Sequence, residues 1–127
     1  MSDELAGKKV LIVDDDRDIV AAMQAAVADL GAETLTAIDG NEAVEQAEQH
    51  APDLVLLDMM LPKRSGLLVM EKLKRGKKKG DSPRVIMVTS NLGSRHKTYA
   101  ESLGVDGYVN KPFRMEKLLE TVKKVLG

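Results

Sequence analysis

The chain has 127 residues, a formal net charge of −1, no cysteine and only three aromatic residues. This length suits one domain, and the lack of cysteine excludes disulfides, thiolate catalysis and cysteine zinc sites. Few aromatics disfavour base stacking, and the near-zero net charge gives no nucleic-acid signal. No apolar run approaches the about 20 residues of a membrane span, and residues 1–9 lack a signal-peptide core. We therefore expect one cytoplasmic domain over residues 1–127, with a flexible N-terminus at 1–7 and no direct binding to membrane or nucleic acid.

Short apolar runs alternate along the chain with segments long enough for helices. The runs predict five strands, at residues 9–13, 34–37, 53–57, 84–89 and 107–110. The other segments predict five helices, at about residues 16–30, from the turn at 39–40 through 49, 65–75, 94–103, and over a last stretch that includes 118–126. Asp16 and Ser65 are the candidate N-caps of the first and third helices.

Five strands separated by helical crossovers predict a parallel sheet. The chain is too short for an eight-fold barrel. The expected fold class is therefore α/β, a flavodoxin-like three-layer (βα)5 sandwich whose five parallel strands have the order 2-1-3-4-5.

Polar side chains stand where the predicted strands end. Asp14 and Asp15 follow the first strand, Asp58 follows the third, Thr89 ends the fourth and Lys111 follows the fifth. In open parallel sheets the carboxyl ends of the strands share one edge, where ligands bind. The strand order predicts that these five side chains form one cluster.

The cluster predicts metal-assisted phosphoryl chemistry. Carboxylates at one crevice repel each other unless a cation joins them, and oxygen ligands with waters suit Mg²⁺. With the acidic charge offset, Asp58 could act as a nucleophile that forms an aspartyl phosphate. Lys111 and the Thr89 hydroxyl could then stabilise the phosphoryl oxygens.

In this order and spacing, the motifs resemble the receiver domain of bacterial two-component response regulators, in its stand-alone, chemotaxis-type form. They are VLIVDDD, DLVLLDMMLP, VIMVTS and GYVNKPF, and they span essentially the whole chain. The resemblance implies a phosphorylation-activated signalling switch that acts in a two-component system or phosphorelay.

The resemblance also implies roles for the clustered residues. Asp58 would accept a phosphoryl group from the phosphohistidine of a sensor histidine kinase or a histidine phosphotransfer protein. Asp15 would bind Mg²⁺ directly and Asp14 through a water, while Asp58 and the backbone carbonyl of Met60 would complete the protein ligands. Lys111 would bind the phosphoryl group.

The same resemblance implies a conformational change on phosphorylation. Thr89 would move toward the phosphoryl group and Tyr108 would turn inward with it, while the bond between Lys111 and Pro112 would be cis. The change would remodel the face of the fourth helix, fifth strand and fifth helix, where a downstream protein would bind. The protein would be a monomer or a phosphorylation-dependent dimer. It would catalyse its own phosphorylation and dephosphorylation without turning over a separate substrate, which leaves open whether it counts as an enzyme.

Three neighbours of the cluster receive secondary roles. Ser90 and Asn91 are expected to influence access to the acyl phosphate. The residue two places after the acceptor often influences dephosphorylation in this family, so the apolar Met60 suggests slow hydrolysis.

Other functions fit the sequence less well. A Mg²⁺-dependent phosphatase with an aspartate nucleophile expects a general-acid aspartate two residues further on, where Met60 follows Asp58. Asp16 does stand at that distance from Asp14, but no segment is long enough for the cap insertion that such enzymes expect. An FMN carrier would need a Ser/Thr/Gly-rich phosphate loop after the first strand, where three aspartates stand instead. The receiver half of a DNA-binding regulator, with its output domain missing, stays open.

We expect a run of basic residues and two histidines to lie at the surface without a specific function. We expect the run to be a solvated helix end, in preference to a patch for an acidic partner or nucleic acid, and His50 and His96 to be surface residues. The run consists of Lys72, Lys74, Arg75, Lys77, Lys78 and Lys79.

Overall fold

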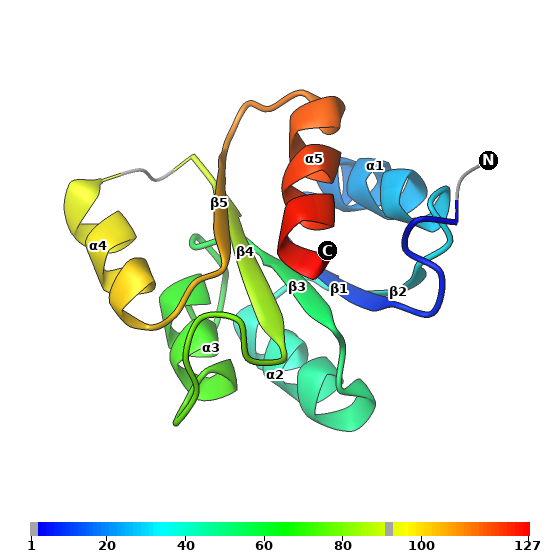
Figure 1. Ribbon diagram of the computed structural model, residues 1–127. Helices are drawn as coiled ribbons and strands as arrows, with labels where there is room; N and C mark the ends of the chain where they lie inside the picture. Colours follow the sequence, from blue (N-terminus) through cyan, green and yellow to red (C-terminus); the bar gives the residue numbers. More distant parts are fainter. Residues whose placement is uncertain (1–2, 91–92) are drawn as a thin grey trace.

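A parallel sheet forms the centre of the computed structural model, which describes residues 3–90 and 93–127 (Figure 1). In the described residues the sheet has the strand order β2-β1-β3-β4-β5, and all neighbouring strands are parallel. The predicted strand order is therefore confirmed. The strands are β1 (Lys9–Val13), β2 (Glu33–Ala37), β3 (Leu54–Leu57), β4 (Arg84–Thr89) and β5 (Gly107–Asn110).

Helices cover both faces of the sheet, which gives the expected three layers. Figure 1 shows α1 and α5 side by side over one face, α2 and α3 beneath the other, and α4 beside the β5 edge. The helices are α1 (Arg17–Ala28), α2 (Gly40–His50), α3 (Gly66–Leu73), α4 (Ser94–Ser102) and α5 (Met115–Leu126). None of the helices in the described residues is long and apolar enough to cross a membrane.

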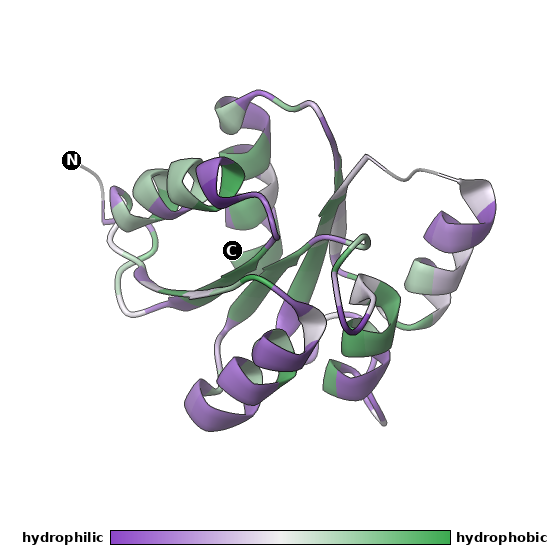
Figure 2. Ribbon diagram, turned by 180° about the vertical axis from the view of Figure 1, so that it is seen from behind, coloured by the Kyte–Doolittle hydropathy of each residue, from purple (hydrophilic) through white to green (hydrophobic). Residues whose placement is uncertain are grey.

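The strand sequences produce two hydrophobic cores because successive side chains point to opposite faces. In β1, Leu11 and Val13 belong to the core under α2 and α3, whereas Val10 and Ile12 belong to the core under α1 and α5. Strands buried on both faces are apolar without interruption. Figure 2 shows hydrophobic colour along the central strands and hydrophilic colour on the outer faces of the helices.

The helix starts follow the predicted caps. The Asp16 carboxylate accepts hydrogen bonds from the N–H groups of Asp18 (3.0 Å) and Ile19 (3.3 Å). The Ser65 hydroxyl accepts one from the N–H of Leu68 (3.3 Å). Such caps satisfy backbone donors that have no partner within the helix. They place the loops after β1 and β3, and with them the acidic residues, at the carboxyl edge of the sheet.

The N-terminal segment contributes one side chain to a hydrophobic core. Leu5 is only 2% exposed, in the core under α1 and α5, and its N–H donates to the carbonyl of Leu30 (2.8 Å). Residues 1–2 of the expected flexible segment, and Asn91, lie outside the described residues.

The basic run differs from expectation at one position. Helix α3 ends at Leu73, and a solvated role is wrong for Lys74, which is 3% exposed. Its ammonium pairs with the Asp106 carboxylate at 2.9 Å, which supplies the missing counter-charge.

Candidate functional site

Two strand ends bring the first carboxylates together. Val13 pairs with Leu57 in the register between β1 and β3, so Asp14 and Asp58 leave the sheet at the same level. The N–H of Asp58 donates to the carbonyl of Val13 (3.1 Å), which continues the pairing by one residue. Adjacent parallel strands therefore hold the two side chains side by side.

Three aspartates form one acidic cluster. Asp14, Asp15 and Asp58 each offer a carboxylate oxygen, and these oxygens lie within 4.8 Å of one another. Asp14 is 1% exposed and Asp58 is 6% exposed, while Asp15 is exposed to solvent. The cluster therefore has a buried floor and an open side.

Lys111 joins this cluster from β5. Its Nζ atom donates to Asp14 Oδ2 at 2.6 Å and to Asp58 Oδ2 at 3.1 Å. The peptide bond between Lys111 and Pro112 is cis, and the N–H of Lys111 donates to the carbonyl of Thr89 (3.1 Å). The lysine therefore spans the carboxyl ends of β4 and β5 and reaches across to β1 and β3.

Burial and charge set the protonation of these groups. Burial raises the pKa of Asp14 above its ordinary value, although the hydrogen bond and charge of Lys111 act against it. Burial alone would lower the pKa of Lys111, but its hydrogen bonds to Asp14 and Asp58 outweigh that effect and leave the pKa raised. Lys111 is therefore an ammonium ion at neutral pH.

Backbone N–H groups hold the two buried carboxylates from the other side. Asp14 Oδ1 accepts from the N–H of Asp16 (2.9 Å), and Asp58 Oδ1 accepts from the N–H of Met60 (3.2 Å). Each carboxylate thus has one oxygen on Lys111 and one on its own loop. Such fixed hydrogen bonds preorganise the side chains for a ligand.

Gly66, which the sequence analysis did not single out, supports the loop that carries Asp58. A Cβ atom built on Gly66 would meet the carbonyl oxygen of Asp58 at 2.0 Å. The N–H of Gly66 also donates to the carbonyl of Met59 (2.8 Å). The sequence contained one signal for this role: Gly66 directly follows a predicted helix cap and lies close to a candidate nucleophile.

Thr89 and Tyr108, the two predicted switch residues, lie in different parts of the structure. Thr89 is fully buried at the end of β4, one strand from Asp58. Tyr108 lies in β5 opposite Met87, and it packs on the core under α2 and α3, away from the acidic cluster. Its hydroxyl is buried without a hydrogen-bond partner among the described residues. Burial and the nearby Glu101 raise the pKa of Tyr108, so its phenol is protonated at neutral pH.

The donor set fits a hard divalent cation. Three carboxylate oxygens within 4.8 Å of one another, one of them on an exposed residue, match the preference of Mg²⁺ for a few carboxylates and several waters. No cysteine or histidine belongs to the cluster in the described residues, which disfavours a site for a softer metal.

Fold and site together define an α/β signalling domain of the receiver class. A model of the response regulator receiver domain matches residues 10–123, so the chain belongs to this family. The resemblance of the motifs to a response-regulator receiver domain is thereby confirmed.

The curated relatives are transcriptional regulators. The chain is 37% identical over 119 residues to the alkaline phosphatase synthesis transcriptional regulatory protein PhoP of Bacillus subtilis, covering 94% of this chain and 48% of that protein. It is 39% identical over 115 residues to the transcriptional regulatory protein DltR of Streptococcus agalactiae, covering 91% and 50%. The chain therefore spans about half the length of these relatives.

Solved structures agree with the fold. A CheY-like response regulator receiver domain protein from Methanospirillum hungatei superposes with a TM-score of 0.82 at 30% identity, covering 94% of this chain and 93% of that chain. The receiver domain of the sensor histidine kinase PA1611 from Pseudomonas aeruginosa gives 0.81 at 26% identity, covering 96% and 99%. That second structure has a magnesium ion coordinated in its active site cleft.

Proposed function

We propose that this receiver domain is a phosphorylation-activated switch in which Asp58 accepts the phosphoryl group. The observation that carries the proposal is the position of Lys111, whose ammonium contacts both Asp58 (3.1 Å) and Asp14 (2.6 Å). A carboxylate held beside a fixed cation at the open edge of a parallel sheet is suited to attack an electrophilic phosphorus.

The transfer step uses groups that the chain itself provides. A carboxylate oxygen of Asp58 attacks the phosphorus of a phosphohistidine, and the P–O bond forms as the P–N bond breaks. The electron pair of the P–N bond returns to the imidazole nitrogen. Lys111 remains charged throughout and can shift from the Asp58 oxygen to a phosphoryl oxygen, since its raised pKa keeps the proton in place.

Asp15, Asp58 and the Met60 carbonyl would hold Mg²⁺ directly, and Asp14 would hold it through a water. The closeness of the three carboxylates supports this assignment, as does the magnesium ion in the cleft of the PA1611 receiver domain. When bound, the ion supplies positive charge that offsets the negative charge gathered on the phosphoryl oxygens. Loop hydrogen bonds to Asp14 and Asp58 keep both carboxylates oriented.

The proposed switch connects Thr89 with Tyr108. The Thr89 hydroxyl would donate to a phosphoryl oxygen on Asp58, and Tyr108 would turn inward as Thr89 moves. A buried hydroxyl without a partner is costly, so the Tyr108 hydroxyl favours any rearrangement that provides an acceptor. The movement would change the face formed by α4, β5 and α5, where a downstream protein would dock.

The proposal also covers the phosphoryl donor, the cellular location and the oligomeric state of the domain. The phosphoryl donor would be a sensor histidine kinase or a histidine phosphotransfer protein, and the domain would act in the cytoplasm as a monomer or a phosphorylation-dependent dimer. Its relation to two transcriptional regulators supports this location. We assign residues 1–127 to one domain that catalyses its own phosphorylation and dephosphorylation.

A second function has its own support. PhoP and DltR are about twice as long as the matched region, so the chain could equally be the receiver half of a DNA-binding regulator. In that case the same switch would control an attached output domain.

Mass spectrometry after incubation with acetyl phosphate and Mg²⁺ tests the proposed acceptor. We expect a gain of one phosphoryl group that is absent in Asp58→Asn and persists in Asp53→Asn, a matched control directly before β3. Phosphorylation of the folded Asp58→Asn variant to the wild-type level would overturn the assignment.

A further inference from the structure

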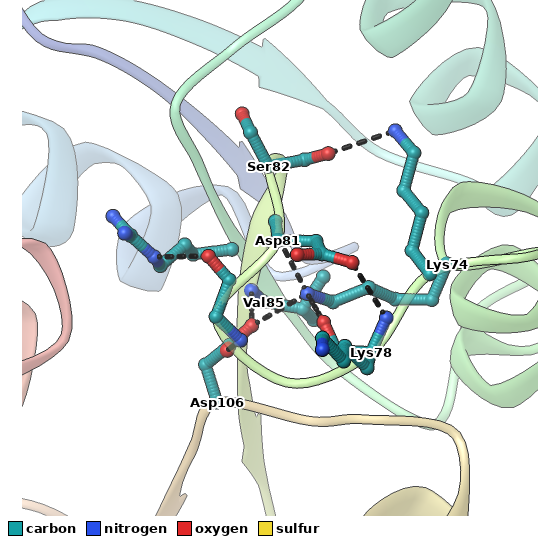
Figure 3. Close-up of polar contacts among 9 residues, drawn as sticks. Lys74, Lys78, Asp81, Ser82, Val85 and Asp106 are labelled. Atoms are coloured by element: carbon teal, nitrogen blue, oxygen red, sulfur yellow. Dashed lines mark hydrogen bonds and ion pairs between the residues drawn. The ribbon is translucent and has the colours of Figure 1, made fainter.

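A buried ion pair anchors the loop between α3 and β4, on the edge of the sheet opposite the acidic cluster. Figure 3 shows Lys74 and Asp106 at the centre of this network. The carboxylate of Asp106 accepts hydrogen bonds from the N–H groups of Gly80 (2.6 Å) and Val85 (2.8 Å). The ammonium of Lys74 donates to the carbonyl of Asp81 (2.7 Å) as well as to Asp106.

The anchored loop helps to enclose a groove at the amino ends of β4 and β5. The groove has a volume of about 520 Å³, within the range of about 300–1,000 Å³ that small-ligand sites occupy. Four cationic side chains line it, and they come from the loop, the start of β4 and helix α5. They are Lys79, Arg84, Lys117 and Lys124.

The acidic residues in the groove leave this positive charge largely uncompensated. Asp106 lines the groove, but its charge is already paired with Lys74. Glu120 is the other acidic lining residue, and it lies 4.0 Å from Lys117, as an exposed pair that contributes little. Within the part of the chain that the structure describes, Lys79 and Lys124 form no ion pair.

Arg84 adds a directional donor group. Its Nε atom donates to the carbonyl of Gly80 (3.1 Å), which orients the guanidinium at the groove. Among the described residues its terminal nitrogens have no hydrogen bond or ion pair. A guanidinium held in place in this way matches the geometry of phosphate oxygens.

We propose that this groove is a binding site for a small anion that carries at least two phosphate groups. Cations on three separate elements surround one concavity, which suits a compact ligand whose charges point in several directions. A nucleic-acid backbone would instead be met by a patch or stripe of cations along one face of the protein. The groove is separate from the proposed phosphoryl acceptor, because it lies at the starts of β4 and β5 whereas Asp58 follows the end of β3. Tyr108 of the proposed switch is nevertheless one of its lining residues.

Inorganic pyrophosphate is the probe that tests the site, with chelator present to keep divalent metal away from both ligand and protein. In ¹H–¹⁵N spectra of the whole chain we expect saturable shifts at Gly80, Arg84 and Gly107, which fit one site per chain. The double variant Lys79→Gln/Lys124→Gln should weaken binding by about tenfold or more. Both lysines are exposed, so this variant should fold normally.

The double variant Lys72→Gln/Arg75→Gln is the matched control. It removes the same net charge, from the basic run that also contains Lys79, but neither residue lines the groove. Equal loss of affinity in both double variants would overturn the proposal, because it would show only general attraction to a basic surface. The absence of saturable shifts up to about 10 mM pyrophosphate, or binding of an acidic peptide without binding of pyrophosphate, would overturn it as well.

Discussion

The ammonium of Lys111 lies 2.6 Å from the carboxylate of Asp14, although the two residues are 97 positions apart in the sequence. The same ammonium contacts Asp58. One cation thus stabilises two carboxylates that adjacent strands force together.

Loss of the lysine charge should destabilise the metal-free protein. In Lys111→Gln the two buried carboxylates lose their shared cation and repel each other. We expect the free energy of unfolding to fall by roughly 1–3 kcal/mol, the usual cost of leaving buried polar groups unsatisfied. Urea denaturation with chelator present measures this change. Lys117→Gln, which removes an exposed lysine, is the control, and equal stability of both variants would contradict the prediction.

Substitution of Asp14 should instead increase the free energy of unfolding near pH 7. The pKa of Asp14 in the folded protein is raised above its ordinary value of 3.8, so the folded state favours the protonated form. This contribution to stability is fully present below pH 3.8 and is lost as the pH rises through the folded pKa. We therefore expect Asp14→Asn to be more stable than the wild type near pH 7, and to lose that advantage on acidification to about pH 3. Urea denaturation at both pH values measures the difference, and an Asn variant less stable near pH 7 would contradict the prediction.

The buried pair of Lys74 and Asp106 should show strong coupling. Each single substitution, Lys74→Met or Asp106→Asn, leaves the other charge buried, at a cost of about 3–5 kcal/mol. The double variant removes both charges, so it should lose clearly less than the sum of the single losses. Denaturation of all four proteins measures the coupling energy. Additive losses would show that the pair does not act as a unit.

Gly66→Ala should disturb the loop that carries Asp58. Its Cβ atom would lie 2.0 Å from the Asp58 carbonyl oxygen, so the backbone must move. We expect a loss of about 2 kcal/mol or more, together with slower phosphorylation by acetyl phosphate. Gly76→Ala is the control: that residue has a φ of +73° and open space around it, so a loss of about 1–2 kcal/mol from the left-handed backbone alone is expected. Equal effects of the two substitutions on the phosphorylation rate would contradict a role for Gly66 at the site.

The fold could be predicted because its signals are local. Apolar runs such as Val10 to Val13 and Leu54 to Leu57 mark buried strands, and alternation with helices leaves few possible topologies. The acidic cluster followed from the strand order alone, because that order places Asp14 beside Asp58. The orphaned hydroxyl of Tyr108 did not follow, since it depends on side-chain packing around β5.

The burial of two other residues could not be predicted from the sequence, because it depends on distant parts of the chain. Lys74 stands in a run of cations, and only the fold reveals Asp106 as its partner, 32 residues further along the chain. Leu5 lies in a polar N-terminal segment, where one apolar residue has no periodic context. Both positions depend on long-range contacts that no local pattern encodes. The same holds for the cationic groove, whose four cationic lining residues come from three separate segments.

Chemical trapping of the phosphorylated residue tests the central claim most directly. Borohydride reduces an acyl phosphate to an alcohol and leaves free carboxylates intact, so peptide mapping after phosphorylation by acetyl phosphate and Mg²⁺ identifies the acceptor. We predict that the reduced residue is found at position 58 alone, and that it is absent when Mg²⁺ is removed. A reduced residue at Asp14 or Asp15, or phosphorylated protein without reduction at Asp58, would contradict the account.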